Sequence, residues 1–83
     1  MTLEVLWFAS LRERVGRGHE TVATDAPTVR ALIAELAARS AGHAAALADT
    51  AALRCAVDQA LVDLDAPLDG AREVAFFPPM TGG

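Results

Sequence analysis

The group with the clearest chemical potential in this sequence is the carboxylate of Gly83, which follows Gly82 at the end of the stretch FFPPMTGG. Glycine has no Cβ, so two glycines in a row can pass through a narrow channel and adopt backbone angles that other residues avoid. A free carboxylate is a poor acyl donor, but an ATP-dependent enzyme can adenylate it. The resulting mixed anhydride reacts with sulfur or nitrogen nucleophiles. We therefore expect Gly83 to be the reactive group of an activated carrier.

The residues before the glycines are expected to project this carboxylate away from the body of the protein. Pro78 and Pro79 have no N–H to donate, so strand pairing cannot continue beyond Phe77. Consecutive prolines also favour the polyproline II conformation, in which six residues reach about 20 Å. We predict a folded domain over residues 1–77 and a flexible tail over residues 78–83.

Two periodicities predict the elements of the body. Alternating apolar residues predict strands at residues 2–8, 19–24, 53–57, 60–62 and 73–77. After Thr28, a suitable N-cap, apolar residues recur with helical spacing at Val29, Leu32, Ile33 and Leu36. A short helical turn is expected over residues 9–16, and a second short helix around Leu47. This order favours an α+β fold, a small mixed sheet with one main helix across one face.

Strand alternation also predicts which residues share a face of the sheet. We expect the core under the helix to contain Val5, Trp7, Val74 and Phe76, with Cys55 on the same face. Arg54 and Ala56 are expected to point outward. The open face then holds three large apolar residues, Leu6, Phe8 and Phe77. We predict that these three contribute to a docking surface for partner proteins.

Composition excludes several classes of function. The chain has 83 residues and a formal net charge of −4, and its seven basic residues are scattered arginines. They form no phosphate-binding stripe, so we expect no nucleic-acid partner. No apolar run has membrane-spanning length, so we expect no membrane partner either. The single cysteine excludes an internal disulfide and favours a cytoplasmic location.

The other residues with chemical potential are interpreted as structural. Cys55 alternates with inward-facing neighbours and is expected to be a buried packing thiol. His19 and His43 are expected to be solvent-exposed residues in loops or at a strand edge. A group of three acidic residues lacks the spacing of a calcium loop and is expected to be a solvated turn, so no metal site is predicted: Asp63, Asp65 and Asp69.

Three stretches of the sequence resemble one known family. They are LWFASLRE at residues 6–13, the amphipathic helix after Thr28, and DGAREVAFFPPMTGG at residues 69–83. Together they are similar to the ubiquitin-like sulfur carriers that include the small subunit of molybdopterin synthase. The resemblance covers essentially the whole chain and is weakest over residues 40–52. It implies a ubiquitin-like β-grasp fold with an extended C-terminal tail.

The resemblance also implies a function. In this family the terminal glycine, here Gly83, is adenylated by a ubiquitin-activating-type adenylyltransferase that consumes ATP, and is then converted to a thiocarboxylate. The tail enters the large synthase subunit, where its sulfur passes to a cyclic pyranopterin precursor of the molybdenum cofactor. Gly82 would let the tail pass through both active sites. The chain would bind no cofactor and would not be an enzyme alone. The open face of the sheet and the tail together give the predicted partner-binding residues, which are Phe8, Phe77, Pro78, Pro79, Met80 and Thr81.

Three alternatives remain open at this stage. A sulfur carrier for thiamine synthesis or tRNA thiolation would share the tail chemistry and differ only in the acceptor. A ubiquitin-like modifier would instead join Gly83 to a target lysine through an amide. A plain binding module would use the tail as a plug, and would tolerate an extra residue after Gly83.

Overall fold

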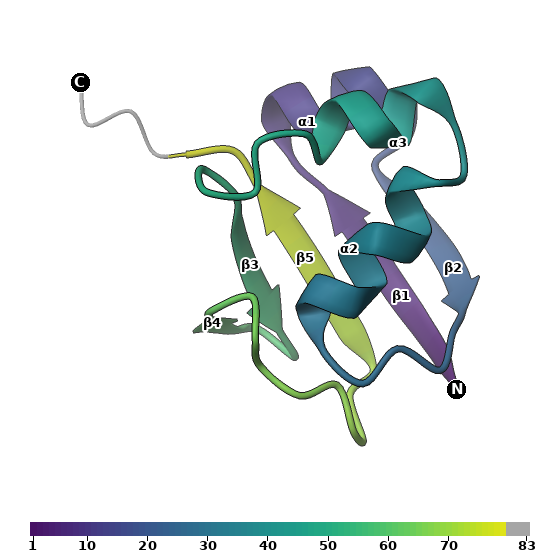
Figure 1. Ribbon diagram of the computed structural model, residues 1–83, viewed down its shortest axis with the longest axis vertical. Helices are drawn as coiled ribbons and strands as arrows, with labels where there is room; N and C mark the ends of the chain where they lie inside the picture. Colours follow the sequence, from purple (N-terminus) through teal and green to yellow (C-terminus); the bar gives the residue numbers. More distant parts are fainter. Residues whose placement is uncertain (80–83) are drawn as a thin grey trace.

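The computed structural model describes residues 1–79; residues 80–83, and with them the predictions for Met80, Thr81, Gly82 and Gly83, lie outside the described residues. A mixed five-stranded sheet has the strand order β2-β1-β5-β3-β4, and three helices accompany it (Figure 1). The elements are β1 (Thr2–Trp7), α1 (Ala9–Val15), β2 (His19–Ala23), α2 (Val29–Ala37), α3 (Ala41–Ala46), β3 (Arg54–Val57), β4 (Ala60–Val62) and β5 (Glu73–Phe77). The predicted α+β class is confirmed.

The two central strands, β1 and β5, run parallel, whereas the other neighbours pair antiparallel. Parallel neighbours end at the same edge of a sheet. The chain therefore passes from β1 into α1, and from β5 into Pro78 and Pro79, at one edge (Figure 1). This topology is what places the root of the tail beside the β1–α1 corner.

The core lies between the sheet and α2, which crosses one face of the sheet (Figure 1). The predicted inward residues Val5, Trp7, Val74 and Phe76 are at most 2% exposed. Helix α2 begins as predicted, because the Thr28 side chain accepts a hydrogen bond of 3.2 Å from the Ala31 N–H. The large apolar residues of the two periodic patterns thus form one continuous core.

Leu68 is a core residue that the sequence pattern did not reveal. It lies in the turn-rich stretch before β5, yet its side chain is 0% exposed. Its backbone N–H donates to the Pro27 carbonyl at 3.0 Å, which ties this loop to the start of α2. The turn residues around Leu68 give no local sign that its side chain is buried, because only the tertiary fold brings this loop over the core.

Helix α3 begins earlier than expected. It spans Ala41–Ala46 rather than centring on Leu47, because the Ser40 hydroxyl caps it by accepting from the His43 N–H at 3.1 Å. The helix packs closely on α1. A Cβ added to Gly42 would lie 2.3 Å from the Arg14 carbonyl oxygen, so only glycine fits at this crossing.

We expect Gly42→Ala to lower the free energy of unfolding by about 1–3 kcal/mol, because the added methyl group forces α1 and α3 apart. Urea unfolding followed by circular dichroism measures this change. Ala44→Gly, on the exposed side of the same helix, is the control and reports helix propensity alone, about 1 kcal/mol. A Gly42→Ala protein more stable than the wild type would show that the two helices do not meet as described.

His43 is buried, so the prediction of an exposed residue is wrong. Its ring is held on both sides: Nδ1 contacts the Ser40 hydroxyl at 2.7 Å, and Nε2 contacts the Glu20 carboxylate at 2.8 Å. The same carboxylate oxygen accepts from the Trp7 indole N–H at 2.8 Å, and Arg39 lies 3.6 Å from the other oxygen. This polar cluster ties α3 to β1 and β2. It escaped prediction because its members are distant in sequence.

The cluster makes stability depend on pH in the acidic range. Burial opposes ionisation of Glu20, but the hydrogen bonds with His43 and Trp7 outweigh it and hold the pKa of the carboxyl below its usual 4.5. A depressed pKa in the folded state means that the unfolded chain binds the proton more readily. The stabilisation is therefore complete above the unfolded pKa and is lost as the pH falls through the folded pKa.

We expect Glu20→Gln to flatten the loss of stability below about pH 5, because the amide cannot titrate. Thermal unfolding over a pH series measures the slope. Glu13→Gln, at an exposed carboxyl on α1, is the control for removing one negative charge. A Glu20→Gln protein with the full wild-type slope would show that the buried carboxyl is not the group responsible.

Candidate functional site

The root of the tail is marked by a pair of stacked aromatic rings. Phe77 ends β5, and Phe8 sits at the N-cap of α1. Their ring centroids are 4.8 Å apart and the ring planes differ by 11°. The Phe8 N–H also donates to the Phe76 carbonyl at 3.2 Å. The parallel pairing of β1 and β5 therefore brings Phe8 and Phe77 together. This agrees with the prediction that both lie on the same face of the sheet.

An apolar row crosses the open face of the sheet beside this pair. Leu6 lies opposite Ala75 in the β1–β5 ladder, Ala75 opposite Ala56, and Ala56 opposite Leu61. The two alanines form the floor of this row, and Ala75 is only 4% and Ala56 only 6% exposed. Ala56 therefore lies on the outward face, as predicted, but its side chain is buried. Small side chains between larger ones are shielded by them.

Leu61 is the residue of this face that the sequence reading missed. Its side chain is 72% exposed, the highest value among the large apolar residues of the described range 1–79. Asp58 and Gln59 form the hairpin turn with positive φ angles of 48° and 73°, and this turn fixes the register that places Leu61 opposite Ala56. Alternation counted outward from that turn could have found it. We call Leu6, Phe8, Leu61 and Phe77 the docking face.

Two hollows lie on either side of the tail root. One is lined by residues of α1, α3 and the loop after α3, together with Pro78 and Pro79. The other lies between β3, β4 and the loop before β3, and Pro79 lines it too. Pro79 is exposed and Pro78 is partly buried. The chain therefore leaves the body between two concave surfaces, next to the docking face.

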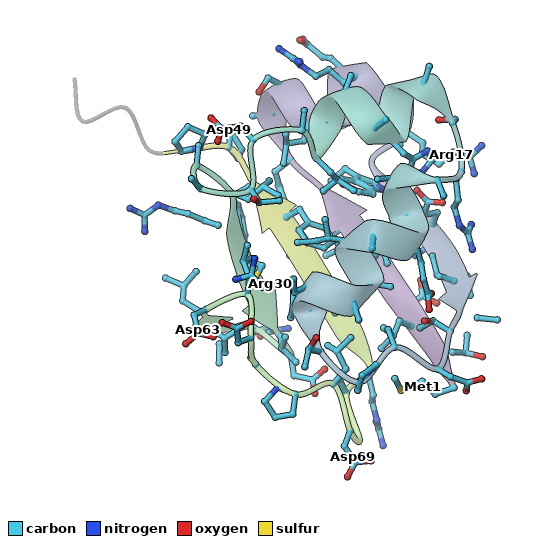
Figure 2. The ribbon with its side chains drawn as sticks, in the orientation of Figure 1. Met1, Arg17, Arg30, Asp49, Asp63 and Asp69 are labelled. Atoms are coloured by element: carbon cyan, nitrogen blue, oxygen red, sulfur yellow. The ribbon has the colours of Figure 1, made fainter. Side chains whose placement is uncertain are left out.

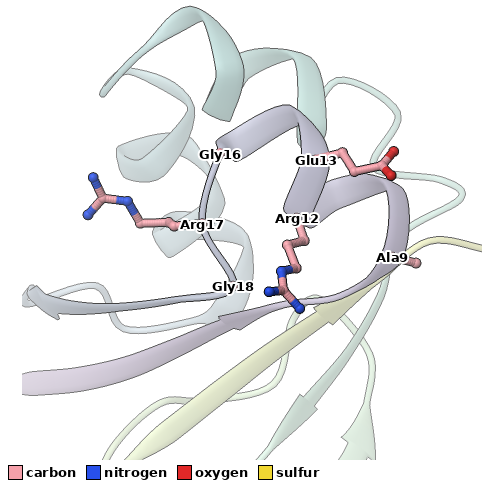
Figure 3. Close-up of a pocket in the computed structure, with 6 residues that line it drawn as sticks. All are labelled: Ala9, Arg12, Glu13, Gly16, Arg17 and Gly18. Atoms are coloured by element: carbon pink, nitrogen blue, oxygen red, sulfur yellow. The ribbon is translucent and has the colours of Figure 1, made fainter.

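A third hollow lies at the same edge of the sheet, between the start of α1 and the start of β2 (Figure 3). Its charged residues do not converge on one point. Arg17 extends to one side while Arg12 extends along the strands, and Glu13 lies on the outer side of α1 (Figure 3). This arrangement does not resemble a binding site for a single small anion.

The remaining candidate residues have structural roles. Cys55 is 1% exposed, and burial, with a contribution from the charge of Asp63, raises the pKa of its thiol, as a packing residue requires. His19 is exposed on the edge strand β2, as predicted, and it contacts Glu4. Asp65 pairs with Arg30 at 2.8 Å. Within residues 1–79, no three His, Cys, Asp or Glu side chains gather where they could hold a metal ion, and no helix could cross a membrane.

Comparison with known proteins agrees with this geometry. The ThiS family model matches residues 5–83. The chain is 52% identical over 81 residues to the molybdopterin synthase sulfur carrier subunit of Escherichia coli strain K12, covering 98% of this chain and 99% of that protein. It is 37% identical to the subunit of the same name from Haemophilus influenzae, with the same coverage of each chain. The crystal structure of SAMP1 from Haloferax volcanii matches 100% of both chains with a TM-score of 0.74 at 24% identity, which confirms the β-grasp fold.

Proposed function

This chain belongs to the ThiS family, and on that premise we propose that it is the sulfur-carrying small subunit of a molybdopterin synthase. Two relatives that align over nearly their whole length carry that name. A carrier subunit supplies a reactant and depends on a second subunit for the remaining chemistry. The large synthase subunit is therefore the first partner to expect.

The proposed chemistry takes place at Gly83. An adenylyltransferase joins the Gly83 carboxylate to the AMP part of ATP and releases pyrophosphate. A persulfide sulfur donor then attacks the acyl carbon and AMP leaves. A thiol reduces the resulting acyl disulfide, which gives the thiocarboxylate and leaves the thiol and the donor joined as a disulfide. In the synthase the sulfur passes to the pyranopterin precursor, and water restores the carboxylate. ATP is consumed by the activating enzyme and has no proposed site on this chain.

The observation that carries this proposal is the position of the docking face at the tail root. Phe8 and Phe77 stack directly before Pro78, and Leu61 is exposed on the same face. A partner that covers these rings is thereby brought to the first residue of the tail. Burial of large apolar side chains supplies affinity, while the two prolines direct the chain into the partner. Thus the folded body binds the partner and orients the chain, and the tail delivers the sulfur.

Reconstitution tests this proposal. The thiocarboxylated chain is mixed with the large subunit and cyclic pyranopterin monophosphate, and the dithiolene product is measured by mass spectrometry after oxidation. We expect product to form in proportion to the carrier supplied, and none with the carboxylate form. If this mixture yields no product while the same carrier delivers sulfur to a thiazole precursor or to tRNA, the molybdopterin assignment is wrong and a carrier of another pathway remains.

A further inference from the structure

The edge of the sheet where the tail leaves carries more positive than negative charge, although the protein is acidic. The whole chain has seven arginines and eleven carboxylate side chains. The three hollows at this edge contain four of these arginines and only two carboxylates, namely Arg12, Arg14, Arg17, Arg54, Glu13 and Asp49. The rest of the molecule therefore holds three arginines and nine carboxylates.

The strand topology separates these charges along the molecule. Asp25 follows β2, Asp58 lies in the β3–β4 turn, and Asp69 lies in the loop that leads into β5. All three positions are at the edge opposite the tail, and Asp69 is seen there in Figure 2. The molecule thus has a negative end and a positive end, and the tail leaves from the positive one.

Two of the four arginines flank the tail root itself. Arg14 lines the hollow that contains Pro78 and Pro79, and Arg54 lines the hollow on the other side of Pro79. The backbone of Arg54 also pairs with Phe77, the last residue of β5. One arginine therefore lines each of the two hollows beside the point where the chain leaves the body.

Both guanidinium groups are available for a partner. Arg14 and Arg54 are exposed, and within residues 1–79 neither has a carboxylate at ion-pair distance. Arg14 makes only a long hydrogen bond of 3.4 Å to the Ala45 carbonyl. By contrast, Arg30 is paired with Asp65 and Arg39 lies near Glu20. Of the five arginines without an ion pair in the described part of the chain, four line the hollows at the tail edge, whereas Arg72, just before β5, lies at the opposite edge.

We propose that Arg14 and Arg54 act as a two-sided electrostatic guide that recognises acidic side chains on the rim of the large subunit's tail channel. This inference rests on the proposed function. The planar guanidinium binds a carboxylate through two parallel hydrogen bonds, which fixes orientation as well as attraction. Charges at the rim of an interface act mainly on the association rate, whereas a buried apolar centre acts mainly on dissociation. The guide therefore aligns the tail root before the docking face closes.

Stopped-flow measurement of the association of the intact chain with the large subunit tests the guide. We expect the double variant Arg14→Gln/Arg54→Gln to associate about tenfold more slowly than the wild type at low ionic strength, with little change in the dissociation rate. At about 0.5 M salt the difference shrinks to less than about twofold, because counterions screen the charges. The matched control Arg30→Gln/Arg72→Gln removes the same net charge away from the tail and stays within about twofold of wild type.

Three results would overturn the guide. Equal slowing of both double variants would show that only net charge matters. An unchanged association rate and salt dependence in Arg14→Gln/Arg54→Gln would show that the two arginines meet no acidic rim. Slower adenylation without slower association would assign the arginines to the activating enzyme instead. If the wild type itself does not bind the large subunit, the proposed function fails as well, which separates the two conclusions.

Discussion

A chain that lacks Gly83 will still bind the large subunit but will transfer no measurable sulfur. One residue spans up to about 3.5 Å of extended chain, so its removal draws the terminal carboxylate back from the reacting groups of both enzymes. Since a displacement of about 1 Å can cost 100-fold in rate, we expect a loss of at least about 1,000-fold. Single-turnover assays of adenylation and of sulfur transfer measure the two steps separately.

Substitution at the same position provides the control. Gly83→Ala keeps the length of the tail and adds one methyl group, so it should lose less activity than the deletion. Addition of one residue after Gly83 should be as damaging as the deletion, because the acyl group is again misplaced. If the deletion variant, which ends at Gly82, transferred sulfur at the wild-type rate, the chemistry would not depend on the position of the terminal carboxylate.

The second large effect is expected from Phe8→Asp, which places a carboxylate on the docking face beside the tail root. We expect affinity for the large subunit to fall at least about 100-fold, because the partner would have to bury an unpaired charge and would lose the Phe8 ring. The fold should survive. Phe8 is 42% exposed and occupies the N-cap of α1 without any side-chain capping bond, a position that aspartate favours.

In Phe8→Asp, the stability gained from the new N-cap should offset the stability lost with the aromatic stack. The Phe8–Phe77 stack contributes about 0.5–1.5 kcal/mol beyond burial, and a new N-cap contributes about 1 kcal/mol. Isothermal titration calorimetry measures the affinity and thermal unfolding measures the fold. Ala23→Asp is the control, because it adds the same charge on the same face of the sheet at the far end of β2. Equal affinities of Phe8→Asp and the wild type would remove Phe8 from the interface.

Local patterns were enough to predict most of this architecture. Alternation separated Val5 and Trp7 from Leu6 and Phe8, and both sets lie on the expected faces. The cap at Thr28 and the spacing after it predicted α2, and Gly16 ends α1 in the left-handed conformation. These features depend on neighbours within one or two turns of chain. The tail motif is likewise contiguous, so its chemistry could be proposed from the sequence.

The features that were missed depend on contacts between distant residues. His43 and Glu20 are 23 positions apart, and neither has a local signal of burial. Leu68 is buried only because its loop folds against the start of α2. Leu61 belongs to the docking face only through the register of a three-residue strand. In each case the environment is created by pairing and packing that a one-dimensional pattern does not encode.

The central claim is that the acyl group of Gly83 carries sulfur, and intact mass spectrometry tests it most directly. The purified chain is incubated with its adenylyltransferase, ATP and a sulfur source, alongside a chain that lacks Gly83. We predict that the full chain gains the mass difference of one oxygen replaced by sulfur, and that the shortened chain does not. An unchanged mass of the full chain, under conditions in which the same enzyme converts another carrier, would contradict the account.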